Sequence, residues 1–203
     1  MTTCLITGGA GFIGSHLTEA CLGKGWKVIV LDDLSAGKRE NLPLDAPGLE
    51  FIRGDVRDRD LLGRIREGHP SIDYVFHLAA IVSVPRSMEH PLETHEVNFL
   101  GTLFLLDAFR DAGVRKLALA SSAAVYGDRV TLPIREDFLP NPLSPYGADK
   151  LMGEYYLKIY NDAFDLPTVA CRFFNVFGER QDPSSPYSGV ISIFLDRAVK
   201  GKG

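Results

Sequence analysis

The chain has 203 residues, of which 45% are hydrophobic and 24% are charged, and these proportions are typical of a soluble globular protein with a single core. Its net charge is −4 and its 22 basic residues are scattered, which argues against a surface that binds nucleic acid. No apolar run is long enough to span a bilayer, so we expect no membrane partner.

Apolar runs of strand length alternate with segments of helical periodicity along most of the chain. Strands are expected at residues 4–7, 27–33, 49–55, 74–80, 116–122 and 168–178. Helices are expected around residues 13–21, 58–68, 91–113, 144–154 and 191–198. This alternation predicts βαβ units, and therefore an α/β fold with a Rossmann-like, doubly wound parallel sheet.

The stretch "ITGGAGFIG" stands between the first strand and the first helix and contains Gly8, Gly11 and Gly14. Glycine lets the backbone turn tightly and approach a pyrophosphate, and a helix N-terminus offers free N–H groups to an anion. The spacing is G-x-x-G-x-x-G rather than G-x-G-x-x-G, and glycines also serve ordinary tight turns. The position between a strand and a helix nevertheless favours a dinucleotide-binding turn.

Asp32 ends the second strand, 18 residues after Gly14. An acid at this place can accept hydrogen bonds from the adenosine ribose hydroxyls. Its charge, reinforced by Asp33, would repel the additional phosphate of NADP, so the sequence favours NAD as the cofactor. Lys38 and Arg39 lie nearby and leave NADP open as the alternative.

Tyr146 and Lys150 lie four residues apart in "SPYGADK", so they share one face of the expected helix. A tyrosine and a lysine at this spacing, without other evidence, are usually a surface tyrosine beside a solvated lysine. Next to a nicotinamide cofactor, however, the tyrosine could act as a base, because the lysine ammonium and the cationic nicotinamide ring both favour the phenolate. The phenolate could then take a proton from a substrate hydroxyl, and Ser122, at the end of the fifth strand, could share that proton.

The cysteines and histidines follow no pattern of a disulfide framework or a metal site. We expect Cys4, Cys21 and Cys171 to be reduced and buried. We expect His77 to be a buried histidine with satisfied hydrogen bonds rather than an acid or a base. The N-terminus has no features of a secretion signal, so a cytoplasmic location is expected.

Eight motifs together resemble the extended short-chain dehydrogenase/reductase family and, within it, the sugar-nucleotide enzymes similar to UDP-glucose 4-epimerase. They are "TGGAGFIG", "LDDLSAG", "GDVRD", "HLAA", "VNFLGT", "SSAAVYG", "SPYGADK" and "RFFNVFGERQDP". The resemblance implies that Ser122, Tyr146 and Lys150 form the catalytic set. It also implies that Ser122, Tyr146 and Asn175 bind the substrate, with Asn175 facing its phosphates.

The same resemblance implies a set of residues around NAD. In this set Asp55 and Val56 flank the adenine, Asn98 supports the site and Phe173 lies near the nicotinamide. The full set is Gly8, Gly11, Phe12, Ile13, Gly14, Asp32, Asp33, Leu34, Ser35, Gly37, Asp55, Val56, Leu78, Ala79, Ala80, Asn98, Tyr146, Lys150 and Phe173.

The residues after Ser122 indicate which reaction of the family is expected. Dehydratases that resemble this protein carry an acidic pair there, and related decarboxylases carry a glutamate, whereas this chain has Ala123 and Ala124. The remaining reaction is oxidation at C4 of a UDP-hexose, rotation of the keto sugar and return of the hydride, which is 4-epimerisation. A sugar-nucleotide reductase or dehydratase of the same family, or a non-catalytic NAD-binding module, stays as the alternative, and a homodimer is left open.

Two domains are expected, a NAD-binding domain at 1–175 and the start of a C-terminal substrate-binding lobe at 176–203. Relatives of this kind continue beyond this point, so the lobe is expected to be largely missing and the last apolar stripe exposed and prone to self-association. That stripe consists of Ile191, Phe194, Leu195 and Ala198. Five phenylalanines are expected to lie mostly in the core: Phe104, Phe109, Phe173, Phe174 and Phe177.

Overall fold

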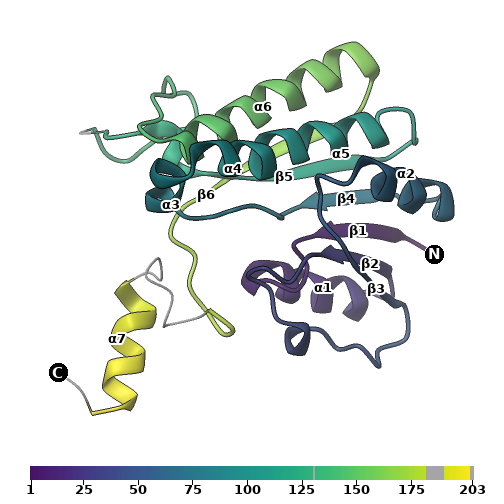
Figure 1. Cartoon of the computed structure of the whole chain (residues 1–203), viewed down its shortest axis with the longest axis horizontal. Coiled ribbons are helices and arrows are strands. Elements are labelled where there is room, and N and C mark those ends of the chain that lie inside the picture. Colours follow the sequence, from purple (N-terminus) through teal and green to yellow (C-terminus); the bar gives the residue numbers. More distant parts are fainter. Residues whose placement is uncertain (130, 182–189, 202–203) are drawn as a thin grey trace.

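Six parallel strands form one sheet, in the order β3-β2-β1-β4-β5-β6. The structure is a computed structural model and describes residues 1–129, 131–181 and 190–201 (Figure 1). The strands are β1 (Thr3–Thr7), β2 (Lys27–Asp32), β3 (Leu49–Arg53), β4 (Tyr74–His77), β5 (Lys116–Ser122) and β6 (Thr168–Phe173). The strand order reverses direction between β1 and β4, so the predicted Rossmann-like, doubly wound sheet is confirmed.

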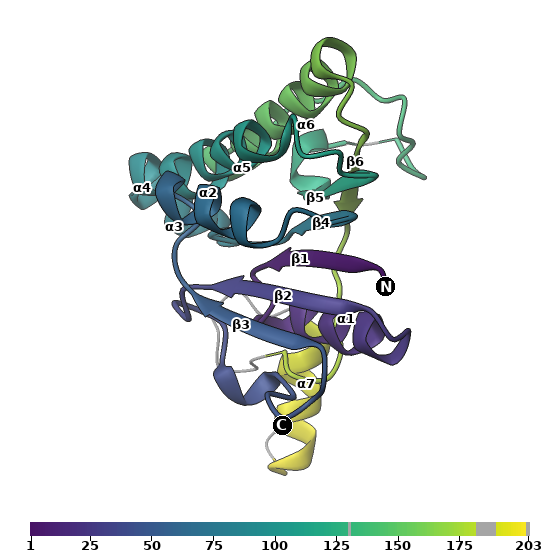
Figure 2. The same cartoon turned by 90° about the vertical axis from the view of Figure 1, so that its right-hand side faces the viewer.

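Helices cover both faces of the sheet (Figures 1 and 2). One face carries α1 (Phe12–Gly23), and the other carries α2 (Arg59–Gly68), α5 (Gly101–Phe109) and α6 (Pro145–Phe164). The shorter elements are η1 (Arg39–Asn41), α3 (Val84–Glu89), α4 (Pro91–His95), η2 (Glu96–Leu100) and η3 (Ala123–Tyr126), and α7 (Val190–Val199) is the last helix described. Within the described ranges, no helix combines the length and apolarity needed to cross a membrane.

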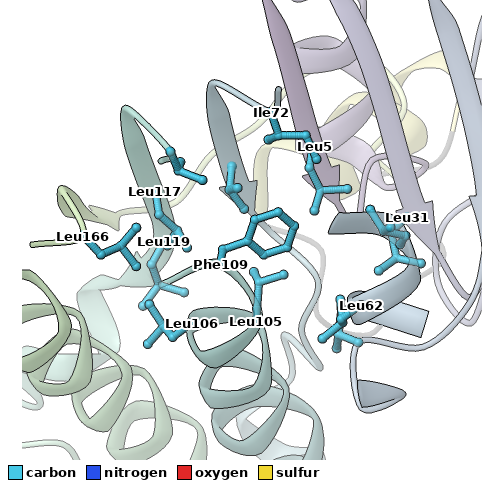
Figure 3. Packing of buried hydrophobic residues seen from close by; sticks show 14 of the residues in the cluster. Leu5, Leu31, Leu62, Ile72, Leu105, Leu106, Phe109, Leu117, Leu119 and Leu166 are labelled. Carbon is cyan, nitrogen blue, oxygen red and sulfur yellow. The ribbon is translucent and has the colours of Figure 1, made fainter. Parts of the chain in front are cut away.

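The alternation of side chains along the strands divides the core into two layers. In β1, Leu5 packs into the larger cluster, under α2, α5 and α6, while Cys4 and Ile6 pack into the smaller cluster with α1. Strands β1 and β2 are covered on both faces and are buried along nearly their whole length, whereas burial alternates from residue to residue along β4 and β5. Figure 3 shows Leu106 and Phe109 of α5 packing against the strands on the sheet face that α2, α5 and α6 cover.

The predicted single helix at 91–113 is wrong in one respect, because three elements share its path. The π-helical turn η2 separates α4 from α5, and the last helical residue is Phe109 rather than Gly113. In this turn, the Asn98 side chain accepts a hydrogen bond from the Ile81 N–H at 2.7 Å and donates one to the Ile81 carbonyl at 3.0 Å. The turn therefore ties the helix to the loop that follows β4.

The strand predicted at 168–178 ends at Phe173, and the one predicted at 74–80 ends at His77. Consequently Phe174 and Phe177 lie outside the sheet and are 56% and 59% exposed, which corrects their expected place in the core. Phe109 is fully buried, Phe104 packs partly buried against the core, and Phe173 is half-buried.

The expected burial holds for two of the three cysteines. Cys4 and Cys21 are buried, whereas Cys171 is exposed. Cys171 lies on β6, an edge strand whose burial alternates, so one side of that strand is open among the described residues. In α7, the side chains of Ile191, Phe194 and Leu195 are exposed, as predicted.

Leu106→Ala is expected to reduce the free energy of unfolding by about 2–5 kcal/mol, because the side chain is fully buried and its removal leaves a cavity. Leu139→Ala is the matched control, since Leu139 is 80% exposed, and it should change the free energy by no more than about 0.5 kcal/mol. Urea unfolding measures both values. Similar losses in the two variants would contradict the assignment of the core.

Candidate active site

The glycine turn after β1 is held by close backbone contacts. Gly8 has φ +71°, and a Cβ atom built on it would lie 2.6 Å from the Ala79 nitrogen. A Cβ on Gly14 would lie 2.1 Å from the Gly8 carbonyl oxygen. Only glycine therefore lets β1, the start of α1 and the end of β4 approach so closely.

Helix α1 begins at Phe12 with Gly11 as its N-cap, and no side chain caps it. The first N–H groups of a helix have no partner within the helix, so those of Phe12 and Ile13 are available to an external acceptor. The helix dipole favours a negative charge at this end. The turn and the helix start thus provide a cradle suited to a phosphate group.

Asp32 is held at the carboxyl end of β2 by the same turn. It is 6% exposed, and its carboxylate accepts hydrogen bonds from the backbone N–H groups of Ala10 at 2.9 Å and Leu34 at 2.8 Å. Burial raises the pKa of Asp32, and these two N–H groups oppose the rise. Gly37 passes so close that a Cβ on it would lie 2.9 Å from an Asp32 oxygen.

The other residues predicted after β2 lie in the same loop. The Asp33 carboxylate accepts hydrogen bonds from the Ser35 N–H at 2.8 Å and hydroxyl at 2.6 Å, and Leu34 adopts φ +64°. Asp33 and Ser35 are exposed and Leu34 is half-buried. Asp32 and its neighbours therefore form a structured loop beside the glycine turn.

Asp55 and Val56 follow β3. The Arg57 guanidinium donates two hydrogen bonds from Nε and one from Nη2 to the Asp55 carboxylate, the shortest at 2.6 Å, and it lowers the pKa of Asp55. Val56 is buried, and a Cβ on Gly101 would lie 2.8 Å from it. The predicted adenine contact of Asp55 would therefore be made beside an existing ion pair.

His77, at the end of β4, belongs to a buried hydrogen-bond network. The Thr102 hydroxyl donates to the Asn98 carbonyl at 2.6 Å, so its oxygen accepts from His77 Nε2 at 2.9 Å. The Thr7 hydroxyl then donates to Nδ1 at 2.7 Å, and its oxygen accepts from the Ala79 N–H at 3.3 Å. His77 is 1% exposed and both ring nitrogens have a partner, so the predicted buried histidine with satisfied hydrogen bonds is confirmed. Burial lowers the pKa of His77 to about 3. Leu78, Ala79 and Ala80 follow directly in the chain.

The predicted catalytic residues lie where β5 ends and α6 begins. Ser122 is the last residue of β5, and its hydroxyl accepts from the Ala124 N–H at 3.1 Å. Ser144 caps α6 in the same way, accepting from the Gly147 N–H at 3.1 Å, and so fixes the start of the helix. Tyr146 and Lys150 are 9% and 4% exposed, and Lys150 Nζ is 5.9 Å from the centroid of the Tyr146 ring.

The electrostatics of this group bear on the prediction that the Lys150 ammonium and a cationic nicotinamide ring both favour the phenolate. Burial raises the pKa of Tyr146, and a hydrogen bond with Ser122 opposes the rise. Burial also lowers the pKa of Lys150 to about 8, against the attraction of the Asp149 carboxylate. In the protein without a cofactor, burial therefore disfavours the Tyr146 phenolate, and a positive charge such as the nicotinamide ring would be needed for Tyr146 to ionise near neutral pH.

Two residues that were not among the predicted site residues, Glu154 and Arg172, connect the elements that carry this group. Glu154 accepts a hydrogen bond from the Ser121 hydroxyl at 2.5 Å, and from Arg172 Nη2 at 2.7 Å and Nε at 2.9 Å. The Arg172 guanidinium also lies over the Tyr126 ring, 4.7 Å from its centroid. The pair fastens the carboxyl ends of β5 and β6 to α6. The sequence contains one signal that could have indicated Glu154, because it follows Lys150 by four residues and therefore lies on nearly the same helix face.

Phe173 and Asn175 complete the predicted set. Phe173 ends β6 and pairs in register with Ser122, which brings it to the catalytic group. Asn175 is exposed two residues later, and its predicted contact with substrate phosphates stays a prediction.

The predicted residues thus fall into two groups on one edge of the sheet. Parallel strands bring their carboxyl ends together, so the glycine turn and Asp32 lie on one side of the reversal between β1 and β4, and Ser122, Tyr146 and Lys150 lie on the other. Ligands of open α/β sheets bind in the crevice at such a reversal. An uncapped helix start, a fixed acid and an orientated tyrosine suit the phosphate, ribose and reactive end of a dinucleotide.

Comparison with known proteins decides the family. Residues 4–203 match the "NAD dependent epimerase/dehydratase family". The chain belongs to this family. A UDP-glucose 4-epimerase of Mycolicibacterium smegmatis is 43% identical over 201 residues, which are 98% of this chain and 63% of that protein.

Two solved structures of the family are also similar. The UDP-N-acetylglucosamine 4-epimerase of Methanobrevibacter ruminantium, in complex with UDP-N-acetylmuramic acid, is 41% identical, with a TM-score of 0.94 over 100% of this chain and 64% of that one. The UDP-glucose 4-epimerase of Thermus thermophilus, in complex with NAD, is 44% identical, with a TM-score of 0.91 over 99% of this chain and 64% of that one. The chain therefore spans slightly less than two thirds of the length of these family members.

Gly14→Ala is expected to reduce the free energy of unfolding by about 1–3 kcal/mol, because the added methyl group meets backbone atoms that no side-chain rotation can move. Gly23→Ala is the control in the same helix, since a Cβ there meets nothing within 4 Å, and it should stay within about 1 kcal/mol of the wild type. Chemical unfolding monitored by circular dichroism measures both. Equal stability of the two variants would contradict the close contact at Gly14.

Proposed function

We propose that this chain forms the NAD-binding and catalytic part of a UDP-hexose 4-epimerase. The observation that carries the proposal is the placement of Ser122, Tyr146 and Lys150 on the same sheet edge as the glycine turn and Asp32. The names of the similar family members, which include UDP-glucose and UDP-N-acetylglucosamine 4-epimerases, support the same reaction class.

NAD fits the residues of the first group. The N–H groups of Phe12 and Ile13 would hold its diphosphate, and the Asp32 carboxylate would accept from the adenosine ribose hydroxyls. When bound, NAD supplies the hydride acceptor that takes the hydrogen from C4 of the hexose and later returns it. Asp32 and Asp33 together disfavour the extra phosphate of NADP.

The second group would handle the proton. Tyr146 would take the proton of the C4 hydroxyl as the hydrogen on C4 leaves as hydride, so the alcohol loses one proton and one hydride, in total two protons and two electrons, and becomes a ketone. Ser122 would share the proton by a hydrogen bond, and Lys150 together with the cationic nicotinamide ring would provide the positive charge that favours the phenolate. After the keto sugar rotates, Tyr146 returns the proton to the oxygen and the hydride adds to the opposite face, which gives the C4 epimer.

The loop after β5 supports epimerisation over elimination. Ala123 and Ala124 follow Ser122 and carry no acid or base that could remove water from the keto sugar. A reductase would release its cofactor in every cycle, whereas an epimerase regenerates it, so cofactor retained through purification favours the epimerase. A non-catalytic NAD-binding module would have no need for the buried Tyr146 and Lys150.

The substrate and assembly belong to the same proposal. A UDP-hexose would have its phosphates near Asn175, and residues 176–203 would begin the lobe that completes its site. Exposed apolar side chains on the neighbouring helices α4 and α6, namely Leu92 and Ile159, support a homodimer. We place the protein in the cytoplasm.

The wild-type chain should bind NAD more tightly than NADP, because Asp32 would meet the added phosphate with like charge. Asp32→Ser should narrow this preference at least about tenfold without abolishing binding. Asp33→Ser is the control, because Asp33 is exposed and its replacement should change the preference for NAD over NADP less than Asp32→Ser does. Calorimetric titration with each cofactor decides the point, and tighter binding of NADP by the wild type would overturn the assignment.

Tyr146→Phe in the full-length protein should leave NAD affinity nearly unchanged and lower turnover of UDP-glucose to UDP-galactose by about 10²–10⁴-fold, since only the proton acceptor is lost. Tyr155→Phe is the matched control on the same helix, because Tyr155 is 55% exposed, and it should keep normal turnover. Lys150→Ala should reduce both affinity and turnover. Normal turnover by Tyr146→Phe would reject Tyr146 as the base, and a wild-type protein without turnover would reject the proposed function.

A further inference from the structure

Residues 174–181, which we name the strap, connect the two halves of the candidate site. The strap begins after Phe173, the last residue of β6, and its far end lies against α1. The strand order places β5 and β4 between β6 and β1, so the strap must pass the carboxyl ends of those strands. Figure 1 shows it descending from β6 past these strand ends toward α1, and Figure 2 shows the same path from the side.

Arg180 holds the far end of the strap. Its guanidinium donates one hydrogen bond from Nη2 to Glu19 Oε1 at 2.5 Å and another from Nη1 to Ser15 Oγ at 3.1 Å. Both partners belong to α1 and lie four residues apart, so one guanidinium bridges a full turn of the helix. The Arg180 side chain is only 25% exposed, and charge-assisted hydrogen bonds of this kind are among the stronger ones.

These contacts lead directly to the phosphate cradle. Ser15 is fully buried, and its hydroxyl donates to the Phe12 carbonyl at 3.0 Å while its oxygen accepts from Arg180. A Cβ on Gly178 would lie 3.4 Å from the Phe12 ring, and the Glu179 carbonyl oxygen lies 3.0 Å from His16 Nε2. Three successive strap residues therefore contact the first turns of α1.

The backbone of Arg180 also indicates a specific role. Arg180 has φ +66°, a left-handed conformation that residues other than glycine rarely adopt. Such a conformation persists where surrounding contacts impose it. The hydrogen bonds to Ser15 and Glu19 are the contacts that hold this residue in place.

We propose that Arg180 pins the strap across the crevice between the two halves of the site and thereby slows the release of a bound dinucleotide. The inference rests on the proposed function, since it requires NAD in that crevice. A dinucleotide that spans from Asp32 to Tyr146 lies beneath the path of the strap, so it leaves only when the strap swings away. Swinging away breaks both guanidinium contacts with α1, and Arg180 acts as a positioning residue rather than a catalytic one.

The test measures NAD release from this chain, by displacement of a fluorescent NAD analogue in a stopped-flow instrument. Arg180→Met should raise the dissociation rate constant at least about tenfold, since two charge-assisted hydrogen bonds are lost. R180K keeps the charge but reaches fewer acceptors, so it should give an intermediate rate. Glu19→Gln removes one charged partner from the other side and should also accelerate release.

Arg86→Met is the matched control, because Arg86 makes a comparable contact with Glu93 at 2.9 Å, away from the strap. It should release NAD at the wild-type rate. Thermal unfolding of each variant distinguishes a change in NAD release from a general loss of folding. If Arg180→Met does not fold, the NAD release rate of Glu19→Gln tests the proposal.

The outcomes separate the inference from the proposed function. Faster NAD release from Arg180→Met and Glu19→Gln, with unchanged thermal stability and a wild-type release rate in Arg86→Met, supports the role proposed for Arg180. If the chain binds NAD but Arg180→Met and Glu19→Gln both release it at the wild-type rate, the role of Arg180 is contradicted and the proposed function is not. A wild-type chain that does not bind NAD contradicts both proposals.

Discussion

The candidate site depends on the close approach of three backbone segments at the point where the strand order reverses. Gly8, Gly14 and Ala79 belong to the turn after β1, to α1 and to the segment after β4, and their contacts leave no space for a Cβ atom on either glycine. This contact sets where α1 begins, and hence where its free N–H groups lie. Asp32 reaches the same turn through the Ala10 N–H, so the ribose and phosphate positions would be fixed relative to each other.

A second constraint positions the catalytic half. Helix α6 packs on β5 so tightly that a Cβ on Gly153 would lie 2.9 Å from Leu119, and one on Gly147 would lie 2.8 Å from the Ala124 carbonyl oxygen. The half-buried pair of Glu154 and Arg172 then favours one register of α6 on the two strands. Burying such a pair gives little net stability by itself, because desolvation offsets the attraction. Its consequence is geometric, since it holds Tyr146 at a defined distance from the end of β5.

Local patterns predicted much of this arrangement, and contacts between distant segments explain the rest. The order of strands and helices, the glycine turn, Asp32 and the pair of Tyr146 and Lys150 follow from short-range spacing. The strap contacts of Arg180 join residues 161 and 165 positions apart, and no local pattern carries that information. The exposure of Phe174 and Phe177 escaped prediction for a related reason, because apolar composition does not reveal where a strand leaves its sheet.

The central claim is that one dinucleotide spans both halves of this sheet edge. A crystal structure of the chain with NAD tests it most directly. The account predicts the adenosine ribose at Asp32, the diphosphate at the N–H groups of Phe12 and Ile13, and the nicotinamide end beside Tyr146 and Lys150. An adenosine half bound at Asp32 with the nicotinamide end directed away from Tyr146, or NAD bound elsewhere on the protein, would contradict it.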